Sequence, residues 1–143
     1  MATAFLSDQE TLYGGNPPRK IGTDSGSKRY TIFFSKTLPG SGLATGDTIA
    51  LCRIPQGARV IDGAISWSAT QGATATTAIG ISGTAAKYLA ATVTASTAKF
   101  PFAATQALGY GVATTAEETL LATNAAAAWT ASSVLVGHVD YIA

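Results

Sequence analysis

Alternation of hydrophobic and polar residues indicates short β-strands along most of the chain. The clearest segment is 59–67, where a period of two is typical of a strand buried on one side. One face of this strand would hold Ile61, Gly63, Ile65 and Trp67. Runs of β-branched and aromatic residues that stop at Pro or Gly predict further strands. Together the predicted strands cover residues 30–35, 48–54, 59–67, 78–82, 88–94, 99–102, 110–114 and 133–142.

The segment 113–128 carries signals for both a helix and a strand. A capping-box pattern and a run of four alanines favour a helix. Three poor helix formers oppose it, namely Thr119, Thr123 and Asn124. We therefore predict a strand over 118–123 that ends in a turn at Asn124. The chain then has about eight strands at short spacing, which predicts an all-β fold, either an antiparallel β-sandwich or a jelly roll.

The first 29 residues differ from this body, which spans residues 30–143. Two segments with chain-breaking residues, 14–18 and 22–26, leave no room for a regular element between them. We interpret residues 1–29 as an extended N-terminal arm with anchoring side chains, and a frayed terminus is the alternative. The candidate anchors, which would contact a partner or a neighbouring subunit, are Phe5, Leu6, Leu12, Tyr13, Arg19 and Lys20.

The composition limits the classes of function. Ala, Thr, Ser and Gly make up just over half of the 143 residues, only 12% are charged, and the net charge is +1. This balance argues against nucleic acid as a partner. No apolar run is long enough for a transmembrane helix, and the start lacks a signal-peptide pattern, so we expect synthesis in the cytoplasm and no membrane partner. Weak surface charge suits a chain that packs against other subunits.

Few residues could carry chemistry. The single histidine, His138, would share a strand face with Asp140, but no G-x-S-x-G motif supplies a nucleophile, so a structural histidine is the preferred interpretation. One histidine and the single cysteine, Cys52, cannot complete a zinc tetrad within one chain. The acidic residues are scattered, and the adjacent Glu117 and Glu118 would point to opposite sides of a strand. We therefore predict no enzymatic activity, no catalytic residues, no cofactor and no metal.

Three segments, taken in order, resemble a known family. Residues 49–60 contain a strand, a Pro-x-Gly-Ala turn and a second strand, and they are followed by 80–91 and by a closing segment at 134–142. This order resembles small virion structural proteins of tailed bacteriophages, described as head decoration or cement proteins. The resemblance covers residues 30–143. It implies a jelly-roll or sandwich body, assembled as a multimer on the outside of a capsid, without enzymatic activity.

The resemblance sets the expected function, which is decoration and stabilisation of a phage capsid with the major capsid protein as partner. The protein would be made in the host cytoplasm and located on the capsid surface of the virion. A homotrimer is favoured, because three copies fit the threefold and quasi-threefold positions of a capsid. A second hypothesis is a carbohydrate-binding β-sandwich module of a phage tail or secreted protein. It rests on Trp67, Trp129 and five tyrosines, which could stack on sugars.

Overall fold

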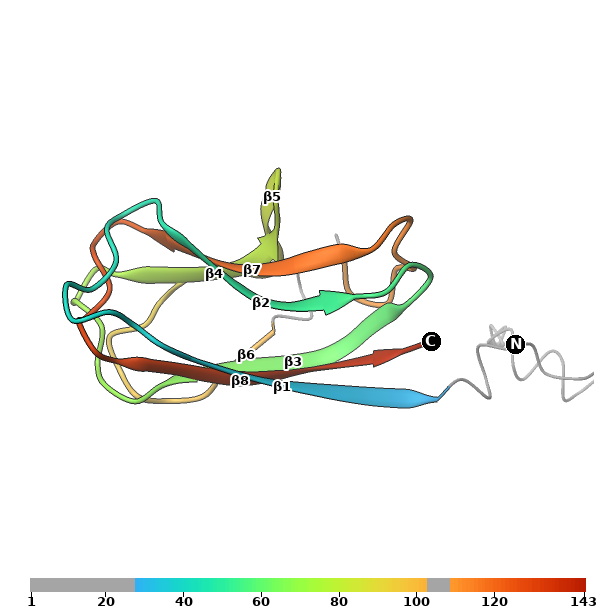
Figure 1. Cartoon of the computed structure of the whole chain (residues 1–143), viewed down its shortest axis with the longest axis horizontal. Helices are drawn as coiled ribbons and strands as arrows, with labels where there is room; N and C mark the ends of the chain where they lie inside the picture. The colour runs from blue at the N-terminus through green and yellow to red at the C-terminus, as the bar shows by residue number, and fades with distance from the viewer. Residues whose placement is uncertain (1–27, 103–108) are drawn as a thin grey trace, which may run out of the picture.

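The computed structural model describes residues 28–102 and 109–143 as two β-sheets stacked face to face (Figure 1). The strands are β1 (Arg29–Thr37), β2 (Thr48–Ile54), β3 (Arg59–Trp67), β4 (Thr76–Ile81), β5 (Thr84–Val93), β6 (Phe100–Pro101), β7 (Glu118–Ala125) and β8 (Val134–Ile142). No helix occurs in these two ranges, and so none there is long and apolar enough to cross a membrane.

The strand pairs nest within one another along the chain. β4 pairs with β5, β3 with β6, β2 with β7 and β1 with β8, all antiparallel. The resulting sheets have the orders β1-β8-β3-β6 and β2-β7-β4-β5. An eight-stranded antiparallel double sheet wound in this way is a jelly roll. The predicted all-β antiparallel fold is confirmed, and the pairing selects the jelly roll from the two architectures expected.

Large apolar side chains between the two sheets form the core. Trp67 and Trp129 are almost completely buried, and their ring centroids lie 5.1 Å apart with the rings tilted by 53°. Other core residues are Val60, Ile65, Ile79, Leu120, Leu135 and Val139. Both sheets contribute to this set, so burial of these side chains holds the sheets together.

The segment with conflicting signals forms strand β7, so the strand prediction is confirmed and the helix alternative is wrong. Every second residue of β7 is buried, namely Leu120, Ala122 and Asn124. β7 lies between β2 and β4, so both of its backbone edges are hydrogen bonded. Sheet pairing and burial therefore outweigh the helix propensity of the alanines. The strand runs to Ala125, and the turn follows at Ala126, whose φ is 69°.

Two other segments differ from the strand predictions. The predicted strand at 110–114 is wrong, because Tyr110 and Ala113 each make only an isolated bridge to β3. Gly111 between them has a φ of 71°, which interrupts an extended backbone. Strand β5 begins at Thr84, earlier than the predicted start at residue 88.

The two faces of β3 follow the predicted alternation only in the second half of the strand. There the core-facing residues are Gly63, Ile65 and Trp67. A β-bulge interrupts the pairing between Val60 and Asp62. A bulge adds one residue to one strand and so shifts the alternation of its side chains. As a result Val60 is fully buried and Ile61 only half-buried, which corrects the predicted face for the first half.

The predicted boundary between arm and body falls at Arg29. The prediction places Arg29 in the arm, but this residue is the first of β1, pairs with Ile142 and contacts Asp140 through its side chain. The candidate anchors of the arm lie outside the described residues. They are Phe5, Leu6, Leu12, Tyr13, Arg19 and Lys20.

Candidate functional site

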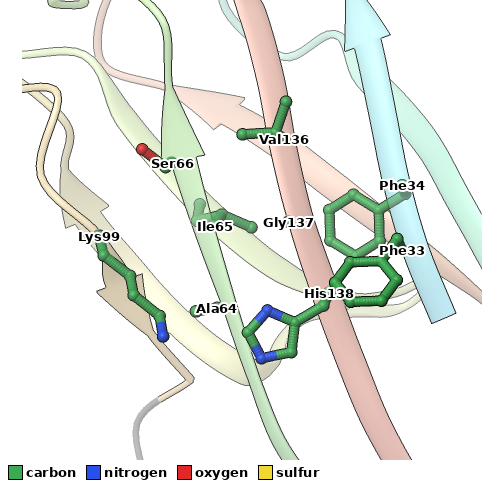
Figure 2. A pocket seen from close by; sticks show the side chains of 9 residues that line it. All are labelled: Phe33, Phe34, Ala64, Ile65, Ser66, Lys99, Val136, Gly137 and His138. Atoms are coloured by element: carbon green, nitrogen blue, oxygen red, sulfur yellow. The ribbon is translucent and has the colours of Figure 1, made fainter. Parts of the chain in front are cut away.

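An open groove lies on the outer face of the β1-β8-β3-β6 sheet, on the side away from the core (Figure 2). Its volume is about 350 Å³. We call it the outer groove, and its lining residues are Phe33, Phe34, Ala64, Ile65, Ser66, Lys99, Val136, Gly137 and His138. Phe34 and Ile65 are core residues, and the exposed apolar side chains of the lining are Phe33 and Val136. Exposed apolar side chains are unusual on the face of a sheet that faces solvent.

Phe33 is the dominant feature of the outer groove. Its side chain is 80% exposed, more than that of any other large apolar residue that the structure describes. Phe33 lies opposite His138 in the β1–β8 pairing, with the two ring centroids 6.0 Å apart. Val136, two residues along β8 on the same face, is 42% exposed. Neighbouring apolar side chains exposed in this way make a candidate contact surface.

Small residues form the floor of the outer groove. Ala64 lies opposite His138 in the β3–β8 pairing, and Gly137 precedes this histidine on β8. A Cβ atom at Gly137 would lie 2.4 Å from the Ala64 carbonyl oxygen and 2.6 Å from the Phe34 ring. Phe34 therefore packs directly on the backbone at Gly137, and a larger residue there would displace it. This close packing fixes β1 against β8 beneath the groove.

Three polar side chains also line the outer groove, namely Ser66, Lys99 and His138 (Figure 2). Ser66 Oγ donates a hydrogen bond to the Thr97 carbonyl oxygen at 3.2 Å. Within residues 28–102 and 109–143, no serine or threonine hydroxyl is hydrogen bonded to the His138 imidazole. The groove therefore does not present the pairing of nucleophile and base that covalent catalysis needs.

A cluster of titratable residues adjoins the outer groove at His138. Ligand atoms of Asp62, His138 and Asp140 lie within 4.8 Å of one another. Asp62 pairs with Asp140 across β3 and β8. The predicted shared face of His138 and Asp140 is confirmed. The acidic residues are scattered in the sequence, and Asp62 was not predicted as part of a site, because only the pairing of β3 with β8 brings it here.

Among the described residues, Asp140 is the one charged residue that is buried, with 4% of it exposed. The Arg29 guanidinium donates a hydrogen bond to its Oδ2, whereas its buried Oδ1 has no hydrogen-bond partner. Burial alone would raise the pKa of Asp140. Hydrogen bonding from Thr31 and Arg29, together with the positive charge of Arg29, outweighs burial and lowers this pKa below its ordinary value. The lowered pKa keeps Asp140 ionised at neutral pH. Its Oδ1 is the carboxylate oxygen without a hydrogen-bond partner.

A second charged network joins β5 to β7. Glu118 accepts hydrogen bonds from Lys87 Nζ at 2.5 Å and from the Tyr88 hydroxyl at 2.8 Å. Burial and the hydrogen bond to Glu118 raise the pKa of Tyr88 well above its ordinary value. The neighbouring Glu117 is exposed and pairs with Arg53. The two glutamates thus point in different directions, as predicted, and Glu118 holds two strands together.

Cys52 on β2 and the two tryptophans offer no reactive or sugar-stacking group. Burial raises the pKa of the Cys52 thiol to about 11, so it stays protonated and unreactive at neutral pH. Trp67 and Trp129 are core residues, so they cannot stack on a sugar. The carbohydrate-binding hypothesis thus loses both tryptophans on which it rested.

Chains of solved phage capsid structures share this fold. A chain of the cyanophage Pam1 capsid asymmetric unit is 21% identical, with a TM-score of 0.65 over 81% of this chain and 85% of that chain. A chain of the capsid of Ralstonia phage GP4 is 21% identical, with a TM-score of 0.67 over 80% and 84%. A chain of the acidic stable capsid of Helicobacter pylori bacteriophage KHP30 is 14% identical, with a TM-score of 0.57 over 82% and 93%. No protein-family model and no curated protein matches the sequence.

Proposed function

We propose that this chain is a non-enzymatic structural protein of a phage virion, which decorates and stabilises the capsid by binding the major capsid protein. The observation that carries the proposal is the outer groove, where Phe33 is 80% exposed on a hydrogen-bonded sheet. The fold that this chain shares with chains of three phage capsids supports the virion as its location. The resemblance of residues 30–143 to decoration proteins supports the same role.

The extent of the structural alignments supports a component of a capsid. The alignments cover similar, large shares of this chain and of its structural neighbours, so chains of about this length are components of those capsids. A decoration protein binds the assembled lattice more tightly than free subunits, so mass action opposes disassembly. We propose a homotrimer, in which three linked copies reinforce one another through avidity.

The outer groove is the proposed contact surface. Apolar side chains of the capsid would cover Phe33 and Val136, and Lys99 on the other side of the groove would meet an acidic group. Covering one large apolar side chain contributes roughly 1.5–3 kcal/mol. A single substitution at Phe33 should therefore have a measurable effect on binding.

We expect the full chain to bind undecorated capsids of the phage that encodes it and to raise their melting temperature. The variant Phe33→Ser should bind at least about tenfold more weakly, because it removes about 1.4 kcal/mol or more of apolar burial. Val93→Ser is the matched control, because Val93 is 50% exposed but lies on β5 of the other sheet. Co-sedimentation with capsids measures both variants.

The two possible failures of this experiment have different meanings. If the unmodified chain neither binds capsids nor stabilises them, decoration is wrong, and a glycan array then tests the carbohydrate hypothesis. If the chain binds but Phe33→Ser binds equally well, decoration stands and the outer groove is not the contact.

The N-terminal arm is proposed to bind a neighbouring capsid subunit. Four large apolar side chains cannot offset the ordering of the whole arm, since ordering costs about 1–2 kcal/mol per residue. The arm must therefore also gain backbone hydrogen bonds, for example by adding a strand to the edge of a neighbouring sheet.

Deleting residues 1–27 tests this proposal and keeps Arg29, which belongs to β1. The truncated body should melt at a similar temperature but bind capsids at least about tenfold more weakly, or about 1.4 kcal/mol. Capsid binding as tight as that of the full chain would rule out a contact between the arm and the capsid. Unfolding of the truncated chain would instead make the arm part of the jelly roll.

A further inference from the structure

We propose that Asp62, His138 and Asp140 form a binding site for a Zn²⁺ ion on the outer face of the β1-β8-β3-β6 sheet. One imidazole nitrogen and two carboxylate oxygens within 4.8 Å of one another supply three ligands of the types that zinc uses in proteins. The proposal is independent of capsid decoration, because it rests on these three side chains and not on any partner.

The sheet itself holds the three ligands in place. Asp62 and Asp140 are paired residues of β3 and β8, and His138 lies two residues from Asp140 on the same face. Zinc bonds of about 2.0–2.2 Å require the ligand atoms to be about 3–4 Å apart. The ligand atoms, which now lie within 4.8 Å of one another, would have to move only slightly closer together to bind the ion. Asp62 can make this movement, because it is exposed and at the edge of the cluster.

The Oδ1 atom of Asp140, which is buried without a hydrogen-bond partner, is the second observation that supports a metal site. Asp140 is 96% buried, since only 4% of it is exposed, and its Oδ1 has no hydrogen-bond partner. A buried, charged oxygen without a partner is unfavourable, and a bound cation removes this cost. Arg29 holds the other oxygen, Oδ2, and so orients the carboxylate as outer-shell partners of metal ligands do.

The charges around the cluster also favour a cation. Asp62 and Asp140 face each other across two strands, and like charges directly opposite are destabilising. Arg29 pairs with Asp140 and also lies in the field of Asp62, and its single positive charge cannot balance two carboxylates. A nitrogen ligand among the three favours zinc over Mg²⁺ and Ca²⁺, which prefer oxygen ligands alone. The exposure of Asp62 leaves the fourth coordination position open to water.

Isothermal titration calorimetry of the full chain, prepared without an affinity tag, tests the site with ZnCl₂. We expect one ion per chain and no binding of MgCl₂ under the same conditions. Asp62→Asn and His138→Ala should each weaken zinc binding at least tenfold. Both residues are outside the buried core, so circular dichroism should show that both variants fold.

Two control variants separate this site from other zinc ligands. Asp47→Asn removes an exposed carboxylate elsewhere and should leave zinc binding unchanged, as should Cys52→Ser. His138 is the only histidine, so its imidazole resonances in NMR spectra report directly on ligation. These resonances should shift on addition of zinc.

Three results would overturn the proposal. The first is absence of zinc binding to the full chain at millimolar concentration. The second is zinc binding that leaves the His138 resonances unchanged. The third is binding that persists unchanged in both Asp62→Asn and His138→Ala.

Discussion

Replacing Trp129 with alanine should lower the free energy of unfolding by about 4 kcal/mol, since truncation of a buried tryptophan costs roughly 3–5 kcal/mol. Trp129 is 2% exposed and packs against Trp67 between the two sheets. The variant would leave a cavity lined by residues that are hydrogen bonded in strands and cannot collapse into it. Small proteins have only about 5–15 kcal/mol of stability in total, so this loss is a large share.

Urea denaturation followed by circular dichroism measures this effect. Phe33→Ala is the matched control, because it also removes an aromatic ring but from a side chain that is 80% exposed. Its free energy of unfolding should change by no more than about 0.5 kcal/mol. Equal losses in the two variants would mean that Trp129 is not part of the core.

Replacing Glu118 with glutamine should lower the free energy of unfolding by about 2–3 kcal/mol. The side chains of Lys87 and Glu118 are only 15% and 11% exposed, so the pair is poorly screened by water. Glutamine keeps the shape of the side chain but removes its charge. The ammonium group of Lys87 would then be largely buried without a counter-charge, which costs more than the lost hydrogen bond alone.

The preceding residue provides the control for this experiment. Glu117→Gln removes the same charge from a pair in which the side chains of Arg53 and Glu117 are 74% and 59% exposed. Exposed pairs contribute about 0–1 kcal/mol, so this variant should unfold almost like the unmodified chain. Chemical denaturation at pH 7 compares the two. If Glu118→Gln and Glu117→Gln are equally stable, the Lys87 ammonium group must be hydrogen bonded to another residue or to water in Glu118→Gln.

The sequence predicted the elements of this fold better than their arrangement. Period-two alternation located most of the strands, because one face of each strand contributes to the core. The bulge at Val60 and Asp62 could not be predicted, since it depends on the pairing of β3 with β8. The residues of the outer groove and of the titratable cluster also depend on strand pairing, so the sequence could predict only part of them. His138 and Asp140 are close in the sequence, whereas Asp62 and Phe33 join them only through strands that pair over long distances.

The nested strand pairing also determines when each part of the protein can form during translation. Among the eight described strands, β1 leaves the ribosome first and its partner β8 last, and 111 positions separate Arg29 from Asp140. Contacts between such distant residues make folding slow. The inner hairpin of β4 and β5 can form early, whereas the sheet that carries Phe33 must wait for β8. Until then β1 has an unpaired edge and exposed aromatic residues, so newly made chains should depend on chaperones to avoid aggregation.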